Sequence, residues 1–194
     1  MNTFTSPRNL RNLSELKRER ESKINFLINN LKLIDVKENK AFDDTTKEIK
    51  KKILLTPVTI GEPSLVDYKF EERPLTHIQK LNGGSPNHYL HNIIFIFTGS
   101  ADLFQYTPES GYSFTSFDHG IIEPVANAIW IEVDLPELNP VQAITEARQL
   151  LRMNFEFIEK NNPSIIQWSS VIEKRIDEQL KQKRIELINL FGGK

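Results

Sequence analysis

The sequence predicts an α+β fold, with N-terminal helices, a central and mostly antiparallel sheet, and a C-terminal antiparallel helical hairpin. Strand-like segments form one block, and helical periodicity lies before and after it, which favours α+β over alternating βα units. The length of 194 residues is enough to bury one substantial core. We therefore expect a disordered tail (1–9), a helical segment (10–56), a β-rich core (57–138) and the hairpin (139–193) to form one domain.

The N-terminal segment has apolar residues at helical spacing from Asn12 to Ile34, which predicts a first helix. The stretch from Asp35 to Asp44 indicates a loop. Thr45 and Glu48 stand three residues apart, as in a capping box, so a short basic helix is expected over Thr46 to Leu54.

The central block is rich in short runs of β-forming residues. Val58–Ile60 and Leu65–Phe70 are expected to be two strands around a turn at Gly61–Pro63, and Leu81–Asn87 is expected to be a loop. Ile93–Phe97 is the strongest strand candidate, and its five apolar residues predict burial on both faces. Further strands are expected over Leu103–Tyr106, Tyr112–Phe117, His119–Val125 and Ala128–Leu135.

The C-terminal segment predicts two helices. Asn139 suits the N-cap and Pro140 the first helical position, and an apolar stripe follows. The run Asn161 to Pro163 indicates a break, because the residue before a proline is pushed out of the helical region. Asn162 or Ser164 then caps the second helix, and the glycines at 192 and 193 end it.

The second helix carries the candidate partner-binding residues. Its apolar stripe is widened by Ile185 and Ile188, so one neighbouring helix is not expected to cover it, and a charged face lies opposite. The stripe is either the inside of a structural hairpin or a surface for docking or dimerisation. The residues expected to bind a partner are Ile172, Ile176, Leu180 and Leu187.

Charge is unevenly distributed, although the net charge is only −1. Residues 1–56 carry 13 basic and eight acidic side chains, residues 57–139 carry three and eleven, and residues 140–194 carry nine and seven. An acidic middle disfavours phosphate binding, so any nucleic acid would be bound by the basic helical ends. The candidates there are Lys47, Lys50, Lys51 and Lys52, whose alternative role is a solvated helix face.

Composition excludes several kinds of site. The chain has no cysteine, which rules out disulfides, zinc thiolate sites and thiol catalysis. It has no apolar run of transmembrane length and no signal-peptide core, so we expect a cytoplasmic protein with no membrane association.

Candidate chemistry is sparse. Glu132 and Asp134 are expected on one face of a strand, where paired carboxylates can hold Mg²⁺, but the lysine of an Asp…Glu-x-Lys nuclease is absent. The histidines are His77, His88, His91 and His119. His88 and His91 are expected in a surface loop, where no nearby carboxylate completes a metal set. Gly83-Gly84 indicates a turn rather than a phosphate loop. We expect no cofactor and no metal.

One stretch of the chain resembles a known group of proteins. It runs Phe95-Ile96-Phe97-Thr98-Gly99-Ser100-Ala101-Asp102-Leu103-Phe104-Gln105-Tyr106-Thr107-Pro108 and is followed by strands and by helices carrying Ile172, Arg175 and Leu187. It is similar to the N-terminal region of bacterial proteins that carry a restriction-endonuclease-like domain further along, with Leu190-Phe191-Gly192-Gly193 at the junction to the nuclease. The resemblance implies an accessory or sensing module in defence against phage that binds a separate effector, and it transfers no catalytic residue.

These observations together predict a non-enzymatic protein-interaction or accessory module, docking an effector subunit or a second copy through its C-terminal helices. The alternative is a nucleic-acid-binding module that uses the basic helical ends. A metal-dependent hydrolase using Glu132 and Asp134 is a third, weaker hypothesis.

Overall fold

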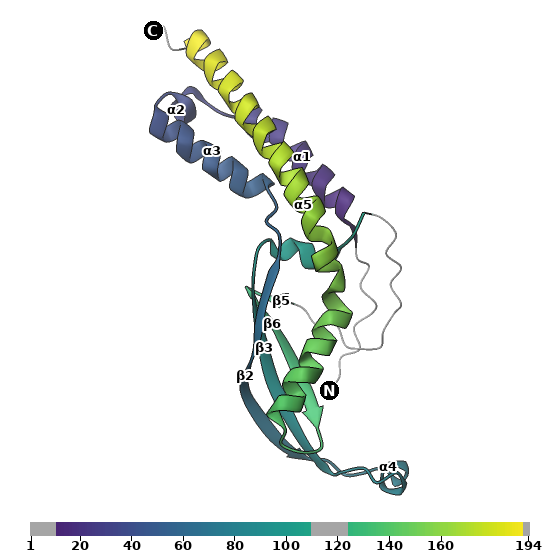
Figure 1. Ribbon diagram of the computed structural model, residues 1–194. Coiled ribbons are helices and arrows are strands. Elements are labelled where there is room, and N and C mark those ends of the chain that lie inside the picture. Colours follow the sequence, from purple (N-terminus) through teal and green to yellow (C-terminus); the bar gives the residue numbers. More distant parts are fainter. Residues whose placement is uncertain (1–10, 110–123, 192–194) are drawn as a thin grey trace. The chain divides into compact units, whose positions relative to one another are not determined.

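The computed structural model describes residues 11–109 and 124–191, and the expected disordered tail lies outside this range. The described chain is a mixture of helices and strands (Figure 1). In chain order the elements are β1 (Arg11–Asn12), α1 (Leu13–Asn29), α2 (Leu33–Val36), α3 (Asn39–Ile53), β2 (Thr59–Glu72), α4 (His77–Leu81), β3 (Asn87–Thr98), a 3₁₀ helix (Ala101–Gln105), β4 (Tyr106–Thr107), β5 (Pro124–Val125), β6 (Ala128–Leu135) and α5 (Pro140–Phe191).

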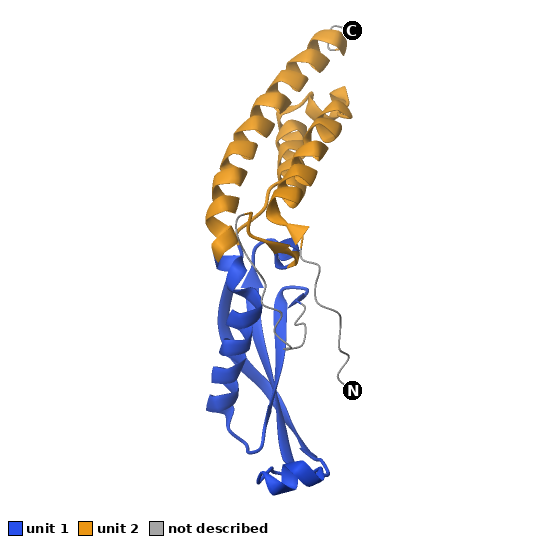
Figure 2. Ribbon diagram, turned by 90° about the vertical axis from the view of Figure 1, so that its right-hand side faces the viewer, with its two compact units in different colours: residues 1–9, 58–104, 113–159 blue, residues 10–57, 105–112, 160–194 orange. Residues whose placement is uncertain are grey.

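The chain divides into two compact units, shown in different colours in Figure 2. The described residues of unit 1 are 58–104 and 124–159, and those of unit 2 are 11–57, 105–109 and 160–191. Helix α5 contributes its first part to unit 1 and its second part to unit 2. That the two units fold together as one domain stays a prediction.

Unit 1 is built on an antiparallel sheet with strand order β2-β3-β6-β5, which confirms the expected α+β class and the antiparallel sheet. The strands are rich in β-branched and aromatic residues, which suit a half-buried pleated surface. Strand β6 has the bounds that its sequence predicts. The expected strand over Leu103–Tyr106 is instead a 3₁₀ helix followed by the short strand β4.

The sheet buries one face, and the expectation that Ile93–Phe97 is buried on both faces is wrong. Ile93, Phe95 and Phe97 are buried, whereas Ile96 between them is 47% exposed. The paired strand β6 alternates in the same way, with alternate residues buried from Ile129 to Leu135. The first part of α5 lies along one side of this sheet in both views (Figures 1 and 2), and its Ala143 and Ala147 are fully buried.

Strand β2 replaces the two short strands expected around a turn. It runs unbroken beside β3, and its register shifts between Ile60 and Pro63 and again between Leu65 and Asp67. The first of these irregularities accommodates the glycine and proline that indicated a turn, so that they lie within the strand. A Cβ at Gly61 would lie 3.1 Å from the backbone oxygen of Ile96, so the glycine serves close backbone approach rather than chain reversal.

Unit 2 is a packing of α1, α3 and the second part of α5. Asn12 caps α1 by accepting a hydrogen bond from the Ser14 N–H (2.8 Å), where the sequence predicts a helix start. The loop expected from Asp35 to Asp44 is wrong, because α3 already begins at Asn39. Thr45 therefore caps nothing: it lies inside α3 and its hydroxyl donates to the backbone oxygen of Asp35 (3.0 Å).

The C-terminal helical hairpin is also wrong, because residues 140–191 form one long helix. Its start is as expected, with the Asn139 side chain accepting from the Gln142 N–H (3.1 Å). The expected break fails because tertiary contacts hold its residues in the helix. Asn161 is buried and donates to the backbone oxygen of Tyr106 (3.0 Å), and Lys17 donates to the hydroxyl of Ser164 (2.7 Å). Pro163 is accommodated inside the helix.

A kink interrupts α5 at Phe155, whose dihedral angles (φ −132°, ψ 15°) are not helical. In a regular helix residues i and i+2 point in nearly opposite directions, so Phe155 and Phe157 could not share one core. Both are nevertheless buried, and Phe155 packs edge-on against Phe104 at 5.0 Å between ring centroids. The local departure from helical geometry is what brings both rings into the core of unit 1.

Candidate interaction surfaces

The four residues expected to bind a partner are core residues of unit 2. Ile172, Ile176 and Leu180 pack in one cluster with isoleucines of α1 and α3. Leu187 is 6% exposed and is also buried. These side chains are covered by the chain's own helices, so the surface that a partner can reach on α5 is a different one.

The last two turns of α5 expose four large apolar side chains, which we call the C-terminal patch. Ile185 is 60% exposed, Ile188 38%, Leu190 72% and Phe191 59%. Ile185, Ile188 and Phe191 follow one another at three-residue spacing and therefore lie on one side of the helix. The sequence signalled this patch in part, since Ile185 and Ile188 made the apolar face too wide for one neighbouring helix.

The basic helix α3 is only partly available to a ligand. The side chain of Lys50 reaches from α3 to α5, with its Nζ 3.0 Å from a Glu173 oxygen and 2.9 Å from an Asp177 oxygen. Partial burial opposes its charge, but hydrogen bonds to Asp177 and Glu173 outweigh this and raise the pKa of Lys50 above its usual value. Lys47, Lys51 and Lys52 are exposed. Lys50 is thus a structural link, and the other three remain candidates for phosphate contact.

Glu132 and Asp134 do share one face of the sheet, as expected, and both are exposed. Both oxygens of Asp134 already have partners: Arg73 Nη1 lies 2.9 Å from one of them and His88 Nδ1 lies 2.9 Å from the other. Across residues 11–109 and 124–191, no cluster of three or more histidine and acidic side chains is arranged to hold a metal ion.

A row of charges runs along β2 next to this pair. Glu71 accepts hydrogen bonds from Lys69 (2.6 Å) and from Arg73 (2.8 Å). The hydrogen bond from Lys69 has the larger effect and those from Arg73 the next largest, and together they lower the pKa of the Glu71 carboxyl to about 2. The Glu71 carboxyl is therefore ionised at neutral pH.

Two histidines expected in a surface loop lie instead on strand β3. His88 points to the charged face, whereas His91 is fully buried on the opposite face. The Nδ1 of His91 lies 2.9 Å from the Tyr89 backbone oxygen, and its Nε2 has no hydrogen-bond partner among the described residues. His77 begins α4, and His119 lies outside the described residues. The Gly83-Gly84 turn is confirmed, with Gly83 at φ 69°.

Aromatic side chains form a second exposed apolar surface, on β2. Tyr68 and Phe70 are each 50% exposed and lie on the same face as Tyr89 of β3. The ring centroids of Phe70 and Tyr89 are 5.1 Å apart, and those of Tyr68 and Tyr89 are 6.4 Å apart. Sequence reasoning missed this surface, although the alternation of charged and aromatic residues from Asp67 to Glu71 could have revealed it.

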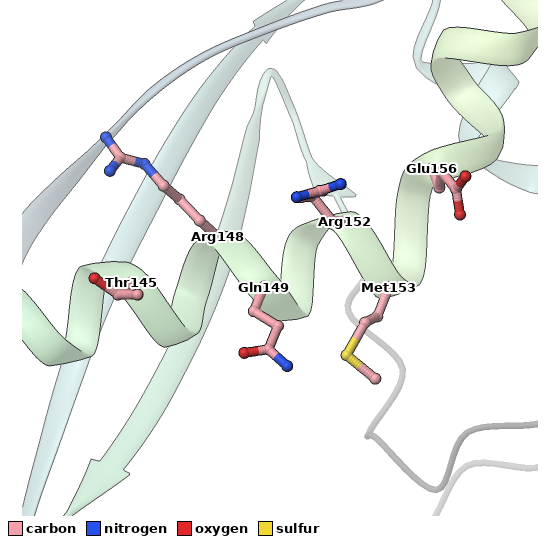
Figure 3. A pocket seen from close by; sticks show the side chains of 6 residues that line it. All are labelled: Thr145, Arg148, Gln149, Arg152, Met153 and Glu156. Carbon is pink, nitrogen blue, oxygen red and sulfur yellow. The ribbon is translucent and has the colours of Figure 1, made fainter.

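A hollow of about 660 Å³ lies along the first part of α5. Its lining side chains, among the described residues, come from that one helix, with Arg148 and Arg152 on one side and Gln149 and Met153 on the other (Figure 3). Arg148 is already paired with Glu62, at 2.7 Å. The described lining thus comes from a single helix, whereas the pockets that enclose small molecules are clefts or cavities with walls on several sides.

In the described parts of the chain, no helix is both long and apolar enough to cross a membrane. Comparison of the chain with protein-family models, with curated proteins and with solved structures finds no match.

Proposed function

We propose that the protein is a non-enzymatic interaction module that docks another protein through the C-terminal patch of α5. The observation that supports this is the exposure of Ile185, Ile188, Leu190 and Phe191 within two helical turns. Large exposed apolar side chains that gather in one region are typical of interaction surfaces. The proposal keeps the expected docking element, α5, and moves the docking residues from its buried stripe to its exposed end.

The energetics favour an apolar partner surface. Full burial of one large apolar side chain contributes about 1.5–3 kcal/mol, so a partner groove that covers several of them gains enough to bind specifically. A helix presenting anchors three residues apart fits the helix-in-groove mode of recognition. Phe191 and Ile188 are the anchors that we expect to contribute most.

The cellular setting that we propose is a bacterial defence system against phage, with an effector subunit as the partner. Its support is the resemblance of the Phe95–Pro108 segment and the following helices to the region that precedes a nuclease domain. Self-association through the same patch is the other form of this proposal.

Nucleic-acid binding is the alternative function. Lys47, Lys51 and Lys52 are exposed on α3 and supply cations for phosphate contact. The observation against it is that Lys50, in the middle of the group, is paired with Glu173 and Asp177, which also bring negative charge close to it. Binding to DNA or RNA that weakens steeply with salt and is lost on replacing the three exposed lysines would support this alternative.

Affinity capture from native cells tests the docking proposal. The tagged wild-type chain is compared with Ile185→Ser/Phe191→Ser and with a matched control, Ile166→Ser/Val171→Ser, which removes exposed apolar residues of α5 outside the patch. We expect one protein to be enriched with the wild type and the control, and its recovery to fall at least about tenfold with the patch variant. Equal recovery by all three chains would contradict the proposal.

A further inference from the structure

Strand β2 is the edge of the sheet in unit 1, and its two halves differ in how well they resist pairing with another strand. Among the described residues, β2 pairs only with β3, and Figure 1 shows it at the outer border of the sheet. The first half carries Gly61, Pro63 and both register shifts, which are devices that blunt an edge. From Asp67 to Glu72 the pairing with β3 is regular, and Arg73 extends it through its N–H to the Pro86 oxygen (2.8 Å).

The regular half also exposes the side chains that a paired strand would cover. Tyr68 and Phe70 lie half exposed on one face. On the other face the charges alternate in sign: Asp67, Lys69, Glu71, Arg73. A regular, unprotected edge strand with exposed aromatic side chains can pair with another strand. The alternating charges on this edge restrict which partner strand and register fit.

We propose that β2 pairs with β2 of a second copy of this chain, antiparallel and with Phe70 on the two-fold axis. In this register Lys69 stands opposite Glu71 of the second copy and Asp67 opposite Arg73, so every charged pair is of opposite sign. A shift of two residues in one direction places Lys69 opposite Lys69 and Asp67 opposite Glu71. A shift of two residues in the other direction places Glu71 opposite Glu71 and Lys69 opposite Arg73. Like charges directly opposite destabilise a strand pair, so the alternation selects one register.

The same register brings the aromatics together. Phe70 faces Phe70 across the axis as a directly opposite cross-strand pair, and aromatic pairs in that position stabilise a sheet. Such an interface is isologous and closes on itself as a dimer. An edge of this length buries less surface than a typical permanent interface, so we expect a dimer that dissociates on dilution.

Charge reversal tests the register directly in the full-length chain. Lys69→Glu alone places Glu opposite Glu71, and Glu71→Lys alone places Lys opposite Lys69, so each variant is expected to be monomeric in sedimentation equilibrium at concentrations where the wild type is dimeric. An equimolar mixture of the two restores both opposite-sign pairs and is expected to form a one-to-one heterodimer. Lys80→Glu, on α4, is the matched control and is expected to dimerise as the wild type does.

Disulfide trapping supplies a second readout, which the absence of native cysteines makes unambiguous. Phe70→Cys is expected to cross-link to itself on oxidation, whereas Glu72→Cys is not. A wild-type chain that stays monomeric to millimolar concentration, or a mixture of the charge variants that forms no heterodimer, would overturn the proposal. The Ile185→Ser/Phe191→Ser variant leaves β2 intact and is expected to dimerise, so this test and that of the docking proposal fail independently.

Discussion

Single side chains on the same helix have opposite roles in this protein, and burial separates them. Ile176 is fully buried among isoleucines of α1, α3 and α5, while Ile185 is mostly exposed. The sequence places both on an apolar face, and only the neighbouring helices decide which one is covered. Stability measurements on the two isoleucines therefore distinguish core from surface.

We expect Ile176→Ala to lower the free energy of unfolding by about 2–5 kcal/mol, because it leaves a cavity in a packed cluster. Ile185→Ala is the matched control and should change stability by less than about 0.5 kcal/mol. Urea unfolding followed by circular dichroism measures both. Similar losses for the two variants would mean that Ile185 is also covered within the chain.

The charged row on β2 gives a second prediction at this scale. Because the pKa of Glu71 is lowered from 4.5 in the unfolded chain to about 2 in the folded one, its ion pairs stabilise the fold above pH 4.5. That contribution is lost as the pH falls through about 2. In a carbon-detected NMR titration, Lys69→Met should move the Glu71 midpoint toward 4.5, and Lys80→Met should leave it unchanged. A Glu71 midpoint near 4.5 in the wild type would contradict these contacts.

Individual elements were predictable where local signals and packing agree. Strand β6 and the start of α5 follow from alternation and from the Asn139 cap, and both are where the sequence puts them. The kink at Phe155 could not be foreseen, because it depends on two rings entering the same core. The predicted helix break at Pro163 is wrong for a similar reason: Asn161 and Ser164 have hydrogen-bond partners far away in the sequence, which no local pattern reveals.

The candidate sites, like the helix break, depend on contacts between residues that are far apart in the sequence. The sequence indicates that α5 has a wide apolar face, but the covered and the uncovered parts of that face cannot be separated without knowing where α1 and α3 pack. Lys50 likewise resembles its neighbouring lysines in the sequence and differs only through Glu173 and Asp177, more than 120 residues away.

The continuity of α5 is testable through its two prolines. Pro163 inside a helix removes a backbone hydrogen bond and crowds the preceding turn, so Pro163→Ala should raise the free energy of unfolding by about 1–3 kcal/mol. Pro140 stands at the first helical position, where proline is favourable, so Pro140→Ala should give no gain. If residues 161–163 formed the turn of a hairpin, Pro163→Ala would be neutral or destabilising in urea unfolding.

For the whole molecule, the two proposed surfaces lie on different compact units: the edge of β2 on unit 1 and the C-terminal patch on unit 2. A dimer joined through β2 would present two copies of the patch. Bivalent presentation raises the apparent affinity for a partner that has two binding sites, without any new contact. Lys69→Glu should therefore weaken binding to a dimeric partner and leave binding to a monomeric partner unchanged, as measured by surface plasmon resonance with the partner at low density.

The central claim is that exposed apolar side chains, rather than reactive or cationic ones, carry the function. Isothermal titration calorimetry of the full chain with its captured partner tests this most directly. We expect a negative heat-capacity change, little dependence on salt, and an affinity at least about tenfold lower for Ile185→Ser/Phe191→Ser. An affinity that is unchanged in this variant and falls steeply with salt would contradict the claim.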